Sequence, residues 1–149
     1  MYKRQSSNNG IQGNGTSEYP SISSTGQYIA FASFSSNFAS TTNGVENIFV
    51  NNSCVTSTTV APVECTVSTA LVTQGAGTPA TASNGNSLVP SISPDGTTVS
   101  FLSFASNLVP RDNNGLEDIF LGSTSFEAST VDFTPQGAMR SAAARRSSQ

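Results

Sequence analysis

The sequence contains no histidine and no tryptophan among its 149 residues, and only 10% of its residues are charged. Without histidine the chain has no Ser-His-Asp triad, no Cys-His pair and no His-ligated zinc site. Six Lys and Arg residues against nine Asp and Glu residues leave a formal net charge of −3, which disfavours a nucleic-acid-binding surface. No run approaches the roughly 20 apolar residues that a membrane-spanning helix needs. Because 36% of the residues are hydrophobic, the composition predicts a folded domain rather than a disordered chain.

Only two cysteines are present, Cys54 and Cys65, and the segment between them is rich in threonine. Two thiols without histidine make a poor metal site. We therefore expect a disulfide that ties the base of a long hairpin loop, the alternative being two unpaired buried thiols. Such a bridge stabilises the fold by about 2–3 kcal/mol in the chain-entropy model. It also predicts an oxidising compartment, although no apolar signal-peptide stretch follows Met1.

An internal repeat is the most informative feature of the chain. Residues 19–31 match residues 89–101 at an offset of 70, and after one inserted residue 43–50 match 114–121 at an offset of 71. The positions that carry the repeat are Pro20, Ile22, Gly26, Phe31 and Phe49 in the first unit, and Pro90, Ile92, Asp95, Gly96, Phe101 and Phe120 in the second. Agreement over some 35 positions indicates two copies of one structural unit.

Each unit is expected to form four short antiparallel strands, and the fold class is therefore all-β. The expected strands are residues 21–23, 28–34, 47–50 and 67–72 in the first unit, and 91–93, 98–104, 118–121 and 129–133 in the second. Asp95-Gly96 predicts a two-residue hairpin turn with positive φ at both central positions. The paired aromatic residues of the two units, Phe34 and Phe104 included, are expected in the core because they recur at equivalent positions.

Four short strands repeated along the chain are typical of β-propeller blades. The segment Pro-Ser-Ile-Ser-Pro-Asp-Gly at 90–96 resembles the WD40-like (PD40) repeat of TolB-like bacterial propellers. Residues 106–120 are similar to a loop-and-strand pattern of exported members, and the resemblance covers about residues 11–133. The first unit departs from it, since Thr25, Thr42 and Asn47 stand where the second unit has Asp95, Asp112 and Asp118.

The resemblance implies an incomplete, open propeller with two blades, because a closed ring needs roughly four to eight. We expect a disordered or artefactual N-terminus at 1–10, blade 1 at 11–80, blade 2 at 81–134 and a disordered tail at 135–149. The partners expected on this interpretation are the remaining blades of a longer protein or other copies of the chain. No nucleic acid and no membrane span are expected, and the expected location is periplasmic or extracellular in a bacterium.

Few residues are candidates for chemistry. Asp112, Asn114 and Asp118, with Glu117 beside them, place oxygen ligands on one loop and suggest a calcium site, whereas an Asx-turn network explains the same residues without a metal. No cofactor other than calcium is indicated, and no catalytic residue is assigned, because the hydroxyl groups have no histidine base. The chain is therefore expected to be a non-catalytic scaffold that binds protein or carbohydrate. The alternative is the gating propeller of a prolyl-oligopeptidase-type peptidase whose catalytic domain lies elsewhere.

Overall fold

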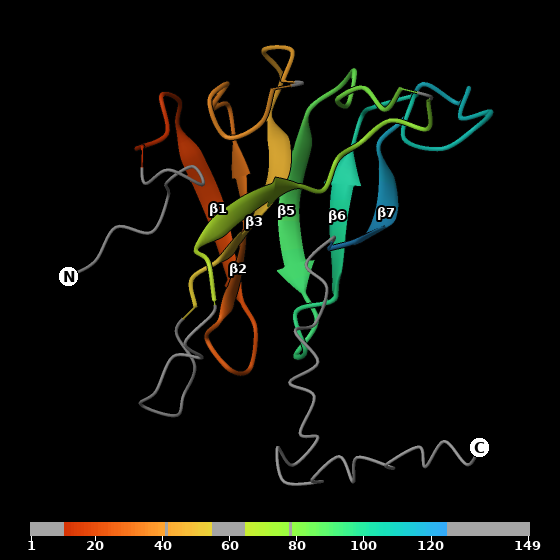
Figure 1. Cartoon of the computed structure of the whole chain (residues 1–149). Helices are drawn as coiled ribbons and strands as arrows, with labels where there is room; N and C mark the ends of the chain where they lie inside the picture. The colour runs from red at the N-terminus through yellow and green to blue at the C-terminus, as the bar shows by residue number, and fades with distance from the viewer. Residues whose placement is uncertain (1–10, 41, 55–64, 78, 125–149) are drawn as a thin grey trace, which may run out of the picture.

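The computed structural model describes residues 11–40, 42–54, 65–77 and 79–124, and every regular element in these ranges is a β-strand. The strands form two antiparallel sheets (Figure 1). The first sheet contains, in spatial order, β1 (Ser17–Ile22), β2 (Tyr28–Ser33), β3 (Asn47–Asn52) and β4 (Ser68–Leu71). The second contains β5 (Ser87–Ile92), β6 (Thr98–Ser103) and β7 (Asp118–Ser123). Across the described residues the fold is all-β and open, and no helix there is long and apolar enough to cross a membrane.

The strands follow the sequence repeat in register as well as in order. Every pair between β1 and β2 recurs 70 residues later between β5 and β6. The six pairs between β2 and β3 recur between β6 and β7, with one extra residue in the connecting loop. A bulge interrupts both β1 and β5, at Tyr19 and Val89, where φ is 50°. The expectation of two equivalent antiparallel units is therefore met for the described strands.

The strand limits differ from the expected ones chiefly in β1 and β5, which begin at Ser17 and Ser87 rather than at 21 and 91. The bulge explains the difference. A simple alternating pattern would end the strand at a residue with positive φ, whereas a bulge lets the strand continue past it. The fourth strand expected in the second unit, at 129–133, lies outside the described residues. The expected terminal segments 1–10 and 135–149 also lie outside them.

The hairpin turns differ from the predicted two-residue type. Ser93 N donates to Thr98 O at 2.8 Å and Gly96 N donates to Ser93 O at 2.9 Å, so the loop spans residues 94–97. Gly96 has φ of 79°, whereas Asp95 keeps a negative φ. The first unit forms the same turn with Ser24 in place of Pro94, since Gly26 N donates to Ser23 O at 3.0 Å and Gly26 has φ of 74°. A type I turn with glycine as its last residue therefore forms in both units, with or without proline. The prediction of positive φ at both Asp95 and Gly96 is wrong.

The two sheets pack together through unlike faces. The first sheet contributes what we call its aliphatic face, which consists of Ala30, Ala32, Ile48 and Val50. The second sheet contributes its aromatic face, which consists of Ile92, Phe101 and Phe120, with Val99 beside them. These side chains form one buried cluster between the sheets. Because both faces of β2 and β3 are covered, the small Ala and Ser residues of β2 are almost completely buried, as expected for a strand packed on both sides.

The aromatic face of the first sheet forms a second cluster on the side away from the second sheet. Phe31 and Phe49 are stacked with ring centroids 5.9 Å apart, and Phe38 packs edge-on against both rings. The corresponding pair in the second sheet, Phe101 and Phe120, has the same 5.9 Å separation. Equivalent phenylalanines thus keep the same local geometry in both units.

The prediction that all the paired aromatic residues lie in the core is wrong for two of them. Phe34 and Phe104 are exposed, although Phe31 and Phe101, three residues earlier, are buried. Both exposed residues come directly after the last residue of a strand, β2 or β6. Beyond the strand end no second sheet covers the side chain, so recurrence in the repeat does not imply burial there.

Candidate functional site

One end of the molecule carries a polar network that is built identically in both units. In the first unit the Asn14 side chain donates to Ser36 Oγ at 2.8 Å and accepts from Ser36 N at 2.8 Å. Asn14 N donates to Asn37 Oδ1 at 3.1 Å, and Asn37 Nδ2 donates to Gln12 O at 2.8 Å. These bonds hold the segment before β1 against the start of the β2–β3 connection.

The second unit repeats each of these bonds 70 residues later. Asn84 Nδ2 donates to Ser106 Oγ at 2.9 Å, and Asn84 Oδ1 accepts from Ser106 N at 2.9 Å. Asn107 Oδ1 accepts from Asn84 N at 2.9 Å, and Asn107 Nδ2 donates to Ala82 O at 3.0 Å. The long β2–β3 and β6–β7 connections lie at this same end, at the top of Figure 1. We call the two networks together the polar end.

A glycine in each network allows the backbones to approach closely. A Cβ atom on Gly15 would lie 2.6 Å from the carbonyl carbon of Phe34, and one on Gly85 would lie 2.7 Å from that of Phe104. Any larger residue would therefore push the two segments apart. The sequence pairs Asn-Gly and Ser-Asn recur in both units, and that recurrence was the signal by which the polar end could have been found from the sequence.

The acidic loop proposed for calcium forms an Asx-turn arrangement. Asn114 Oδ1 accepts from Leu116 N at 2.9 Å, and Asn114 Nδ2 donates to Asp118 Oδ2 at 2.7 Å. Asp112 lines the same surface hollow as Asp118. In the described part of the chain no three acidic or cysteine side chains are grouped closely enough to hold a metal ion. Calcium binding at this loop stays a prediction from the sequence.

Asp95 is engaged in its own turn. Its carboxylate accepts hydrogen bonds from Ser93 Oγ, from Thr97 N at 3.1 Å and from Thr97 Oγ1 at 2.9 Å. The bond from Ser93, followed by those from Thr97, lowers the pKa of Asp95 below its ordinary value. The carboxylate therefore stabilises the β5–β6 turn, and its local bonds account for its place in the repeat.

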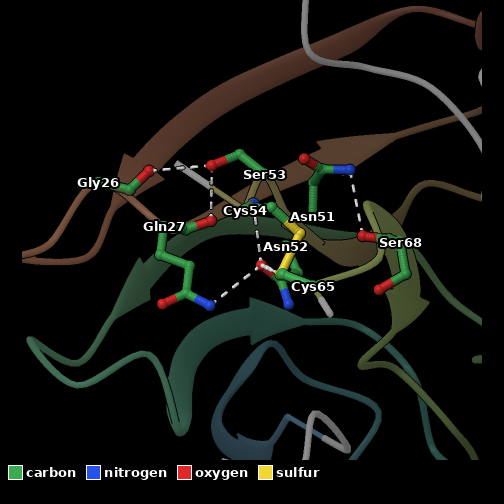
Figure 2. Close-up of a disulfide and its surroundings, with 8 residues drawn as sticks. All are labelled: Gly26, Gln27, Asn51, Asn52, Ser53, Cys54, Cys65 and Ser68. Carbon is green, nitrogen blue, oxygen red and sulfur yellow. Dashed lines mark hydrogen bonds between the residues drawn. A yellow bond between two sulfur atoms is a disulfide. The ribbon is translucent and has the colours of Figure 1, made fainter. Parts of the chain in front are cut away.

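Cys54 and Cys65 are joined by a disulfide with a Cα–Cα distance of 5.7 Å (Figure 2). It connects the end of β3 to the start of β4, as the sequence predicts. Asn52 lies beside it, where its Oδ1 accepts from Cys54 N at 3.1 Å and from Gln27 Nε2 at 3.3 Å. Next to Cys54, Ser53 Oγ donates to the carbonyl of Gln27 at 2.9 Å. The bridge thus fastens the β3–β4 connection to the β1–β2 turn as well.

A buried carboxyl group lies where the two units meet. Glu46 is buried just before β3. Its backbone both accepts a hydrogen bond from the second unit and donates one to it: Ser87 N donates to Glu46 O at 2.8 Å, and Glu46 N donates to Asn86 Oδ1 at 3.1 Å. Its Oε1 accepts no hydrogen bond from the described residues. Burial, and secondarily the negative charge of Glu18, raises the pKa of Glu46. The sequence repeat did not single out this residue.

The remaining surface of note is apolar. Ile119 and Leu121 project from β7 and are among the most exposed large hydrophobic residues of the described chain. Leu121 lines two surface hollows, one shared with Val109 and Pro110 and the other with Ser100.

The chain was compared with models of known protein families, with curated proteins and with solved structures, and none of them matches. Its function must therefore be inferred from its own residues.

Proposed function

We propose that the chain is a non-catalytic segment of an exported bacterial β-propeller, and that it acts as a scaffold for a protein or carbohydrate partner. The observation that carries the proposal is the head-to-tail packing of two equivalent antiparallel units, in which the aromatic face of one covers the aliphatic face of the other. Blades of a propeller are repeated sheets of this size arranged around an axis. The likeness of residues 90–96 to the PD40 repeat of TolB-like proteins supports the same proposal.

The polar end is the surface on which we place partner binding. Its asparagine and serine side chains offer hydrogen-bond donors and acceptors on loops that a rigid double sheet positions. The exposed rings of Phe34 and Phe104 follow the strands at this end. Polar groups beside an apolar ring are the usual composition of a site for a polar ligand with an apolar side.

Two further observations support a non-catalytic, exported chain. The sequence has no histidine to serve as a base for its many hydroxyl groups. The Cys54–Cys65 disulfide fits an oxidising compartment such as the periplasm or the extracellular space.

A titration followed by two-dimensional NMR tests the proposal directly. The isotope-labelled chain is mixed with defined oligosaccharides and with unstructured peptides, and the supernatants are analysed for cleavage products. We expect saturable shift changes at Asn14, Ser36, Asn84 and Ser106, with the added compound recovered intact. Substitution of Asn84 by alanine should weaken binding, whereas substitution of the distant Thr97 should not. Cleavage of an added compound, or shifts confined to the hairpin turns, would contradict the proposal.

A further inference from the structure

The stacking inside the chain leaves one surface of each kind unused. Two like units that pack through unlike faces bury one aliphatic face and one aromatic face. The aliphatic face of the second sheet remains free. On the aromatic face of the first sheet Phe31 and Phe49 are buried, and the part that remains free is the β1 edge at Ile22. Such an arrangement is heterologous, and it repeats until it closes into a ring or grows into a filament.

The aliphatic face of the second sheet consists of Ser100, Leu102, Ile119 and Leu121, which are the repeat counterparts of Ala30, Ala32, Ile48 and Val50. Ile48 and Val50 are fully buried by the second sheet. Ile119 and Leu121 are 77% and 76% exposed. β7 therefore presents to solvent the side chains that its counterpart β3 uses to bind a neighbouring unit.

The first sheet presents the complementary surface. Ile22 is 61% exposed, whereas its counterpart Ile92 is 9% exposed because it packs against the first sheet. Pro20 is likewise exposed and Pro90 buried. The space over Gly26 is open, with only the tip of Ile22 near it. Ile92 and Pro90, by which the second unit docks onto the first, thus have uncovered counterparts in the first unit. The counterparts of Phe101 and Phe120 are Phe31 and Phe49, which are already buried against Phe38 and Leu71.

We propose that these two free surfaces bind each other between two copies of this chain: the Ile119 and Leu121 face of one copy receives the Ile22 side of the first sheet of another. The proposal rests on the repeat-scaffold function proposed above and deepens it by naming the partner surface. Continuity with the interface already present inside the chain supports it.

Backbone contacts of the internal interface have counterparts in the proposed one. Ser21 Oγ accepts from Ile92 N at 3.1 Å, and Glu46 O accepts from Ser87 N at 2.8 Å. Ser91 and Glu117 occupy the positions of Ser21 and Glu46 in the second unit. They place the same two acceptors on the free surface.

Some internal contacts have no counterpart between copies. Ser24 donates to Pro94 O through its N–H at 3.0 Å and through its Oγ at 2.7 Å. In the second unit Pro94 itself stands at the position of Ser24, and proline has no N–H to donate. Binding between copies is therefore expected to be weaker than the internal contact and to depend on concentration.

Sedimentation velocity over a range of concentrations tests the proposal on the whole chain with its disulfide intact. We expect the wild-type chain to associate. Ile119→Lys and Ile22→Lys should each raise the dissociation constant at least about 30-fold, because each places a charge in the centre of the contact. Val89→Lys is the matched control. Val89 and its counterpart Tyr19 are both exposed, so the internal stacking covers neither position.

Mixing the two variants distinguishes this arrangement from others. Ile119→Lys keeps the first-sheet surface and Ile22→Lys keeps the β7 surface, so an equimolar mixture should form a dimer that grows no further. A wild-type chain that stays monomeric at all concentrations would overturn the proposal. Loss of association in Ile119→Lys alone would overturn it too, because it would mean that β7 pairs with itself. If Ile119→Lys lowers the stability of the monomer itself, the Ile119 surface is covered by another segment of the same chain, and the proposal would be overturned. Circular dichroism confirms that each variant is folded, and none of these outcomes affects the titration of the polar end.

Discussion

The two hairpin glycines provide a direct measure of how tightly the second unit is docked. Gly26 and Gly96 occupy the same position of the repeat and have nearly the same φ, 74° and 79°. Substitution of either by alanine places a Cβ in the left-handed region, which costs about 1–2 kcal/mol. A Cβ on Gly96 would also lie 2.1 Å from Cδ2 and 2.7 Å from Cγ of Tyr28, whereas a Cβ on Gly26 would meet nothing closer than 3.9 Å. Overpacking of this kind costs a further 1–3 kcal/mol or so.

We therefore expect Gly96→Ala to lower the free energy of unfolding by about 1–3 kcal/mol more than Gly26→Ala. Urea denaturation of both variants measures the difference, and the effect of alanine on the unfolded chain is the same in both. Combining Gly96→Ala with Tyr28→Ala should remove the excess, since the ring that obstructs the new methyl group is gone. Equal losses in the two single variants would show that the β5–β6 turn is not docked on Tyr28, and the stacking described here would be refuted.

Three further predictions concern stability. Replacement of Cys54 and Cys65 by alanine should cost about 2–3 kcal/mol in urea denaturation, and a thiol assay should detect no free thiol in the unreduced wild type. The pKa of Glu46 is raised above its ordinary 4.5, so its ionised form is destabilised in the fold. This destabilisation is complete at pH values above the pKa of Glu46 in the fold and absent below its ordinary pKa. Urea denaturation at pH 7 and at pH 3 should therefore show that Glu46→Gln is more stable than wild type only at pH 7. Asn14→Ala and Asn84→Ala should each cost about 0.5–1.5 kcal/mol by thermal denaturation, and the two losses should agree because the bonds removed are the same.

Much of the fold was predictable because the repeat doubles every local signal. The alternation of β-branched and aromatic residues predicts β2 and β6 to within one residue of their observed limits. The turn type was not predictable from Asp95-Gly96 alone, because the same pair can also end a type I turn that begins at Ser93, in which only the glycine takes the left-handed conformation. The polar end could be predicted only in part. The recurring Asn-Gly and Ser-Asn pairs are evident in the sequence, but these asparagines and serines are about 22 residues apart and meet only when the strands pair.

The sequence by itself determined that there are two units, where most of their strands lie, and which two cysteines could be bridged. It did not determine which side of each sheet is covered. Ile22 and Ile92 have nearly the same neighbours in sequence and equivalent ladder partners, Ile29 and Val99, yet one is exposed and the other buried. Local propensity depends only on nearby residues and is therefore equal for both. Burial depends on what lies across the sheet, and only the stacking of the second unit on the first makes the two isoleucines different.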